Sequence, residues 1–150
     1  MKWTYNVNRG LTYSDDSTIT LTFGLSRAIV RKMLLYKSDA NNGRFDNEDS
    51  YEKLFDIPGH WIRLSFEKEL LFAIEVLEGI VDFDGVTIET RGNLKNTLDL
   101  LISKGHIFEE ADYSYINRLD NIDLGDSEKH GGVDNLIYWV LVSKNFDYLT

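Results

Sequence analysis

The sequence predicts an α+β fold in which a strongly twisted antiparallel sheet carries two amphipathic helices. Three observations predict it: strand-like alternation in residues 17–23 and 61–77, one strong hairpin signal, and two separate stretches with helical spacing. At 150 residues the chain is long enough for a single domain, residues 1–150, which buries roughly two-thirds of the surface that its unfolded form exposes.

Strands are expected where apolar and polar residues alternate. In Ser17–Phe23, Leu21 and its apolar neighbours face one side while the threonines face the other. In Trp61–Phe66 and Leu70–Leu77 the same pattern predicts a strand pair. Asp84-Gly85 is the strongest hairpin signal, because a type I′ turn requires positive φ at both central residues. The residues expected in the core are Leu21, Leu64, Phe72 and Ile74, and the further strand patterns are Ile80–Phe83, Val86–Thr90, Tyr113–Leu119, Asn121–Leu124 and Leu136–Val142.

Two segments have the apolar spacing and the end signals of helices. Ser26 is a natural N-cap for a helix that runs to about Lys37, and Gly105 ends a second helix, Leu94–Lys104. The first helix is expected to turn Ile29, Val30, Met33 and Leu34 to the core and Arg27, Arg31 and Lys32 to water. The second is expected to bury Leu94, Leu98, Leu101 and Ile102.

The two helical segments also favour an internal repeat. When 24–34 is laid over 92–102, Val30 meets Leu98, Met33 meets Leu101 and Arg27 meets Lys95. Each helix leads into an acidic, tyrosine-bearing segment and then into strands, so two pseudo-repeats, 17–83 and 86–148, account for the pattern. A single sheet with two unrelated helices on one face accounts for it equally well.

Composition excludes several classes of protein. The chain has no cysteine, which excludes a disulfide scaffold and a thiolate metal site. The N-terminus lacks an apolar signal region, and no apolar run approaches the ~18 residues of a membrane span, so a bacterial-type cytoplasmic protein with no membrane contact is expected. The net charge of −9 argues against a nucleic-acid partner, because phosphates require Lys and Arg stripes.

No template for catalysis fits the sequence. The three histidines, His60, His106 and His130, fall in different turns, without the spacing of zinc ligands. The loop that begins at Asp46 has Tyr51 where a calcium loop needs glycine. We therefore expect no catalytic residue, no metal and no cofactor, and we read the carboxylates in the polar stretches as ionised and hydrated.

Two acidic segments carry the whole net charge. Residues 39–56 hold six acids against two bases, and residues 109–134 hold eight acids against two bases. Acids interleaved with tyrosines suit a surface that docks on a basic partner, because carboxylates steer the encounter and aromatic rings supply contact energy. An acid-rich surface that only keeps the chain soluble explains the same composition. The residues predicted to bind the partner are Asp46, Glu48, Asp49, Tyr51, Glu109, Glu110, Asp112, Tyr113, Tyr115, Asp120, Asp123 and Asp126.

A resemblance at the level of pattern adds to this interpretation. The order is Gly24-Leu25-Ser26 opening a helix, the strand pair Trp61–Phe66 and Phe72–Leu77, the hairpin in 81–88, and a second leucine-rich helix. It resembles small bacterial immunity proteins of polymorphic-toxin and contact-dependent growth inhibition systems and, more distantly, tandem repeats of the β-lactamase-inhibitor type. The resemblance spans roughly residues 17–148.

The resemblance implies a function. A protein of this kind binds the basic catalytic domain of a cognate toxin, such as a nuclease, and acts as a monomer or weak dimer without turnover. The alternative is a small accessory or scaffold domain whose partner is not a toxin. A gene directly downstream of a large toxin gene would favour the first.

Overall fold

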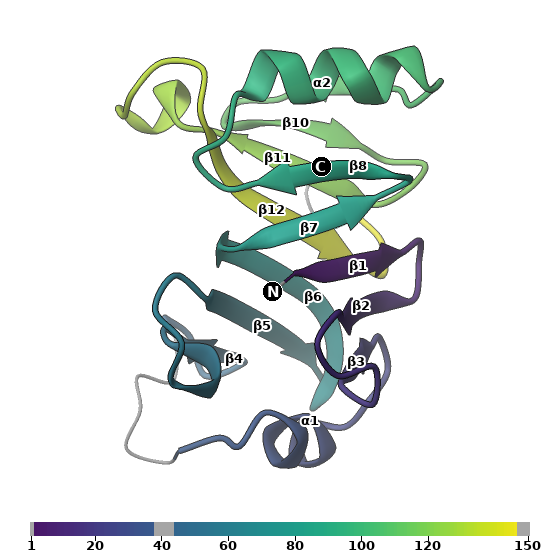
Figure 1. The fold of residues 1–150 in the computed structure, drawn as a ribbon. Helices are drawn as coiled ribbons and strands as arrows, with labels where there is room; N and C mark the ends of the chain where they lie inside the picture. Colours follow the sequence, from purple (N-terminus) through teal and green to yellow (C-terminus); the bar gives the residue numbers. More distant parts are fainter. Residues whose placement is uncertain (1, 38–43, 147–150) are drawn as a thin grey trace.

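The structure, a computed structural model that describes residues 2–37 and 44–146, consists of two sheets and two α-helices. The sheets pack face to face, and α1 (Arg27–Met33) and α2 (Leu94–Ser103) lie at opposite ends of the molecule (Figure 1). With mostly antiparallel pairing and separate helices, the chain has the predicted α+β composition.

The smaller sheet has five strands in the order β3-β2-β1-β7-β8. Strand β1 lies at its centre, antiparallel to β2 and parallel to β7. The hairpin β7–β8 turns at Asp84 (φ 49°) and Gly85 (φ 75°), which confirms the predicted turn with positive φ at both central residues. The strands are β1 (Trp3–Asn6), β2 (Gly10–Tyr13), β3 (Thr20–Thr22), β7 (Ile80–Phe83) and β8 (Val86–Glu89).

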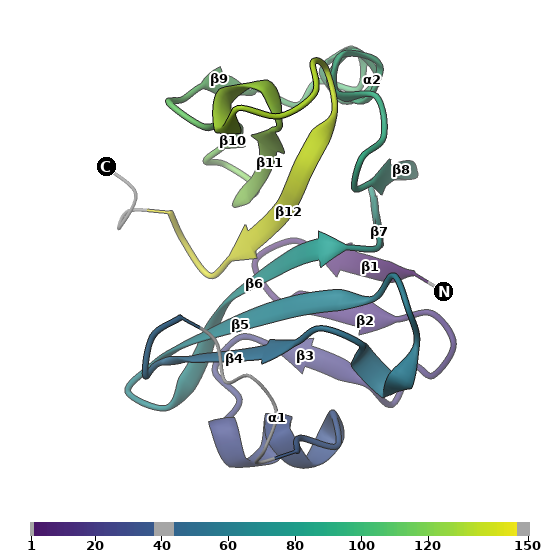
Figure 2. The same ribbon diagram turned by 90° about the vertical axis from the view of Figure 1, so that its left-hand side faces the viewer.

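The larger sheet has seven strands in the order β4-β5-β6-β12-β11-β10-β9. Two antiparallel meanders, β4-β5-β6 and β10-β11-β12, meet at its centre, where β6 pairs antiparallel with β12 (Figure 2). The strands are β4 (Glu48–Tyr51), β5 (Trp61–Glu67), β6 (Leu70–Glu78), β9 (Glu109–Glu110), β10 (Ser114–Asn117), β11 (Ile122–Asp126) and β12 (Ile137–Ser143), and the 3-10 turns are η1 (Leu54–Asp56) and η2 (Glu128–His130).

Both helices begin at a side-chain cap. Ser26 Oγ accepts from Ile29 N at the start of α1, and Asn93 Oδ1 accepts from Asn96 N at the start of α2. The first helix ends four residues earlier than expected, since its C-cap is Leu34 and Leu35 has a φ of 54°. The second follows the prediction, with Lys104 as C-cap and Gly105 at a φ of 96°.

The backbone contacts around the two helix starts follow one pattern. At α1 the bonds are Gly24 N to Leu71 O, Leu71 N to Leu25 O, and Arg27 N to Glu69 O. At α2 they are Arg91 N to Ile137 O, Ile137 N to Gly92 O, and Leu94 N to Asn135 O. Each helix start is thus bonded to the beginning of the last strand of its meander, through bridges Ser26–Leu70 and Asn93–Leu136.

One hydrophobic core lies between the sheets and continues under both helices. Leu21, Leu64 and Ile74 are fully buried in it, as the alternation predicts. Phe72 is only half-buried, because a register shift between Ser65 and Phe66 in the β5–β6 pair turns Leu71 to the core in its place.

The predicted helix faces need correction as well. Arg27 does not face water, since its side chain is only 11% exposed and reaches Asp49. Conversely, Ile29 and Ile102, predicted to be buried, are more than half exposed, because each lies at the edge of its apolar stripe. Trp61 lies out of phase with the buried residues of β5 and donates its Nε1–H to Ser50 Oγ. Asp39 and Asn41-Asn42-Gly43, placed in a polar loop from the sequence, lie outside the described residues, as does the end of the second expected repeat at 148.

Candidate functional site

One carboxylate of the first acidic segment, Asp49, holds α1 to the sheet. Asp49 lies on the side of β4 that faces the helix and is completely buried. Arg31 binds both of its carboxylate oxygens at 2.8 Å, and Arg27 Nη2 lies 2.7 Å from Oδ1. Burial alone would raise the pKa of Asp49, but the hydrogen bonds from Arg31 and Arg27 hold it below its ordinary value. The prediction that Asp49 binds a partner is therefore wrong.

Glu48 is buried on the opposite side of the same strand. Arg44 Nη2 binds it at 2.9 Å, and Arg63 Nη1 binds the neighbouring Glu75 at 2.9 Å. Burial alone would raise the pKa of Glu48, but the hydrogen bonds from Arg44 hold it below its ordinary value. Glu48 and the buried Tyr51 are thus not docking residues, and Asp46 is the one member of this segment's predicted set whose side chain is exposed.

Two acids of the second segment are also committed to the fold. Asp120 Oδ2 is 3.0 Å from Nδ1 of His106, whose Nε2 lies 2.8 Å from Asp84, so His106 joins the β7–β8 turn to the β10–β11 turn. Asp123 is buried beneath the indole of Trp139, which donates to it at 3.0 Å. Burial raises the pKa of Asp123. The interpretation of these carboxylates as hydrated surface groups is wrong for Asp123.

A groove at the α2 end gathers several of the other acids. It has a volume of about 510 Å³ and lies between α2, the β9–β10 hairpin and the 3-10 turn η2. We call it the α2 groove. Its lining residues are Leu94, Lys95, Leu98, Asp99, Ile102, Phe108, Glu110, Tyr115, Asp126, Glu128, Asp134 and Asn135.

The floor of the α2 groove is apolar. Leu94 and Leu98 are buried there, Phe108 and Tyr115 are half-buried, and Ile102 is 52% exposed. Ile102 was predicted to be buried, but it is exposed because it lines the groove. The core ends at Leu101, and the next apolar residue borders the groove instead.

Carboxylates dominate the rim of the α2 groove. Lys129 pairs with Glu110 at 2.6 Å and Lys95 pairs with Asp99 at 2.9 Å. Glu128 and Asp134 face each other, and the hydrogen bond and charge of Asp134 raise the pKa of Glu128. The pair therefore concentrates negative charge, and an incoming cation would reduce the repulsion between the two carboxyl groups.

Apart from the exposed Asp46, the predicted binding residues separate into three groups. Glu110, Tyr115 and Asp126 come together in the α2 groove, although Asp126 is buried and accepts from Glu128 N. Exposed residues beside it or further along the hairpin are Glu109, Asp112 and Tyr113. The residues that serve the fold are Glu48, Asp49, Tyr51, Asp120 and Asp123.

Sequence reasoning missed several groove residues. Glu128 and Asp134 were counted in the acidic segment but not named as binding residues, and Asp99 was not considered. One signal was present in the second helix. Lys95 and Asp99 lie one turn apart on its polar face, and Ile102 follows Asp99 one turn later. The structure shows that Ile102 is exposed. Which loop carboxylates face that stripe depends on tertiary contacts.

Known proteins do not assign a function to this site. No protein-family model, curated protein or solved structure matches the chain. Among the described residues, no three or more His, Cys, Asp or Glu side chains form a group that could hold a metal ion. None of the helices in the described part is long and apolar enough to cross a membrane.

Proposed function

We propose that this chain is an immunity-type protein that binds and neutralises a cognate bacterial toxin domain, and that the α2 groove receives a basic segment of that toxin. The supporting observation is the combination of an apolar floor with an acid-rich rim in one groove. Lys and Arg side chains suit such a groove, because their aliphatic stems pack on Leu94, Leu98 and Phe108 while their charged ends reach the carboxylates.

The distribution of acids favours docking over solubility alone. Acids that only solubilise would be spread over the exposed surface. Here Glu128 and Asp134 oppose each other at the edge of an apolar groove, although their mutual repulsion is unfavourable in the free protein. A nuclease toxin supplies a fitting partner, because it needs basic residues to hold a phosphate backbone.

The arrangement of strands supports a second proposal, that the fold is a tandem pseudo-repeat around a twisted antiparallel sheet. The units are β2-β3-α1-β4-β5-β6 and β7-β8-α2-β10-β11-β12, with matching backbone bonds at both helix starts. The boundary then falls near Gly79 instead of at Asp84-Gly85. Ser26 corresponds to Asn93, so Arg27 corresponds to Leu94, one residue away from the overlay made on the sequence.

Binding kinetics test the functional proposal. The proposal predicts a large toxin gene directly upstream. The probe is the catalytic domain that this gene encodes, and association is followed by stopped-flow fluorescence at several salt concentrations. Glu128→Lys with Asp134→Lys should lower the association rate about tenfold at low salt, and the effect should shrink as salt rises. Phe108→Ala should mainly raise the dissociation rate, by about tenfold or more.

A matched control keeps the net charge change the same. Glu67 and Glu89 are exposed and lie outside the α2 groove, so Glu67→Lys with Glu89→Lys should change the association rate less than about twofold. Equal slowing by both double variants would show that the docking face lies elsewhere. Failure of the wild-type chain to bind the toxin domain or to protect cells that express it would contradict the proposed function.

A further inference from the structure

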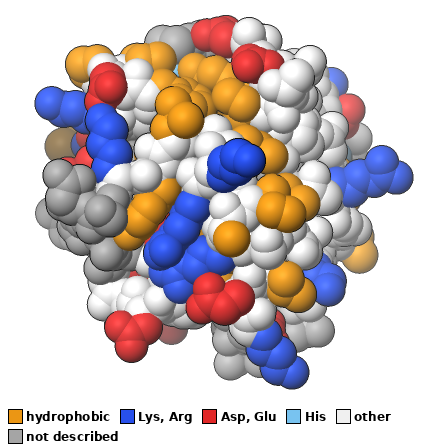
Figure 3. All heavy atoms as spheres, turned by 90° about the horizontal axis from the view of Figure 1, so that it is seen from below, with side chains coloured by type: hydrophobic (Ala, Val, Ile, Leu, Met, Phe, Trp, Pro, Cys, Tyr) orange, Lys and Arg blue, Asp and Glu red, His pale blue; other side chains and the backbone are white. Residues whose placement is uncertain are grey.

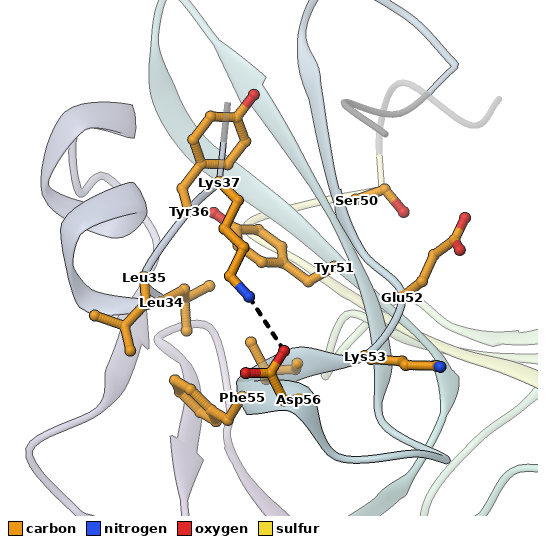
Figure 4. Close-up of a pocket in the computed structure, with 11 residues that line it drawn as sticks. Leu34, Leu35, Tyr36, Lys37, Ser50, Tyr51, Glu52, Lys53, Phe55 and Asp56 are labelled. Carbon is orange, nitrogen blue, oxygen red and sulfur yellow. Dashed lines mark hydrogen bonds and ion pairs between the residues drawn. The ribbon is translucent and has the colours of Figure 1, made fainter. Parts of the chain in front are cut away.

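A second concave site lies at the other end of the molecule, beside α1. It is a pocket of about 320 Å³ between the end of α1, strand β4 and the 3-10 turn η1 (Figure 4). We call it the α1 pocket. Its lining residues are Leu34, Leu35, Tyr36, Lys37, Ser50, Tyr51, Glu52, Lys53, Leu54, Phe55 and Asp56.

The walls of the α1 pocket are mainly apolar. Leu34 and Leu54 are buried at its base, and Phe55 packs against Tyr13 with a ring separation of 5.6 Å. Across the pocket, Lys37 Nζ reaches Asp56 Oδ1 at 3.1 Å, and Figure 4 shows the Lys37 side chain running in front of Tyr51. Because Lys37 and Asp56 are mostly exposed, this ion pair neutralises the mouth without sealing it.

The backbone around the α1 pocket is held in an uncommon conformation. Leu35, Phe55 and Asp56 all have φ between 54° and 60°, in the left-handed region that side chains other than glycine rarely adopt. Such residues cost on the order of 1 kcal/mol or more each, and they gather at ligand-binding sites more often than elsewhere.

Tyr51 supplies an unused hydrogen-bonding group. Its side chain extends from β4 toward α1, is 9% exposed, and its hydroxyl has no hydrogen-bond partner among the described residues. A buried hydroxyl without a partner is unfavourable in the free protein. Burial raises the pKa of Tyr51, so the hydroxyl keeps its proton and remains a donor.

We infer that the α1 pocket binds a small, largely apolar molecule that carries one hydrogen-bond acceptor oxygen, which accepts from the Tyr51 hydroxyl. Cavities of ~150 Å³ hold a single benzene ring, so this pocket has room for a substituted ring or two fused rings. The site is separate from the α2 groove and does not depend on the partner proposed there.

The surroundings of the pocket agree with a neutral ligand. Figure 3 shows the α1 end of the molecule, where Lys and Arg side chains stand among hydrophobic ones. Two cations at the pocket or beside it are paired: Lys37 with Asp56, and Arg31 with Asp49, where it also stacks on Tyr36 with 4.1 Å between Cζ and the ring centre. An acceptor such as a carbonyl satisfies Tyr51 without requiring a further charge in the pocket.

Two probes of similar size test the inference. Acetophenone and isopropylbenzene differ by a carbonyl oxygen in place of a methyl group, and each is titrated into isotope-labelled protein while the amide NMR signals of Leu35 and Phe55 are followed. In the wild-type chain acetophenone should bind about fivefold more tightly than isopropylbenzene. In Tyr51→Phe this preference should fall to about one, while the affinity for isopropylbenzene stays within about twofold.

The variant also has an internal check and a control. Because the hydroxyl of Tyr51 has no partner among residues 2–37 and 44–146, Tyr51→Phe should fold with an unchanged or slightly higher melting temperature. Tyr138→Phe removes an exposed hydroxyl on β12, outside the pocket, and should keep the fivefold preference. The inference is overturned if neither probe gives saturable shifts at these amides, or if Tyr51→Phe retains the preference for acetophenone.

Discussion

At α1, the residue after the N-cap is Arg27, and Arg31 follows one turn later; both reach the buried Asp49 of β4. At α2, the same two places hold Leu94 and Leu98, which line a groove with Tyr115 of β10. Apolar contacts hold both helices to the core, but only α1 adds a buried ion cluster.

The difference has a consequence for function. An ion cluster at α1 neutralises the carboxylate of Asp49 and leaves none of its oxygens for a partner. At α2 the corresponding positions are apolar and need no carboxylate, and Glu128 and Asp134 stand at the rim of an open groove. The two acidic segments thus differ at particular residues: Asp49 of the first is bound inside the fold, whereas Glu128 and Asp134 of the second line an open groove.

The largest effect should come from breaking the ion cluster. Asp49→Asn leaves two arginines without their buried counter-charge, which should lower the free energy of unfolding by about 3–5 kcal/mol in urea denaturation. Replacing all three residues by leucine, Arg27→Leu, Arg31→Leu and Asp49→Leu, should recover most of the loss, because the site then resembles the apolar attachment of α2. A loss below about 1 kcal/mol for Asp49→Asn would mean that the cluster contributes little.

These contacts show which parts of the structure the sequence could predict. The alternation predicted the buried faces of β3 and β5, the cap Ser26 predicted the start of α1, and Gly105 predicted the end of α2. The burial of Asp49 could not be predicted from the local sequence. A carboxylate in an acidic stretch is usually exposed to water, and so are two arginines at (i, i+4) on a helix. Only their juxtaposition in the tertiary fold makes burial favourable. The α2 groove was half predictable, since Glu110 and Tyr115 were named and Asp99 was not.

Acid should affect the two kinds of buried carboxylate in opposite directions. The pKa of Asp49 is lowered in the folded state, so its contribution is present above the unfolded pKa, near ~4, and is lost as pH falls through the folded pKa. The pKa of Asp123 is raised, so its unfavourable ionisation is relieved as pH falls through that raised value toward ~4.

Unfolding measured in urea from pH 6 to pH 2 separates these contributions. Asp49→Asn should flatten the loss of stability in the most acidic part of the range, whereas Asp123→Asn should steepen the overall decline. If both variants changed the slope in the same direction, the assignment of one lowered and one raised pKa would be incorrect.

The smallest effect should come from the exposed ion pair on α2. Lys95 and Asp99 are joined at 2.9 Å in the (i, i+4) arrangement, with 75% and 60% of their side chains exposed. Asp99→Asn should lower the free energy of unfolding by about 0.3–0.5 kcal/mol, and 1 M salt should abolish even this difference, because water and ions screen the pair. The same substitution at Asp49 should keep its full cost in salt, since that carboxylate is buried.

Asp99 nevertheless lies on the rim of the α2 groove, so Asp99→Asn should slow association with a basic toxin domain while leaving stability almost unchanged. A loss of stability above about 1 kcal/mol at Asp99 would remove the distinction between a carboxylate that holds the fold and one that is free to meet a partner.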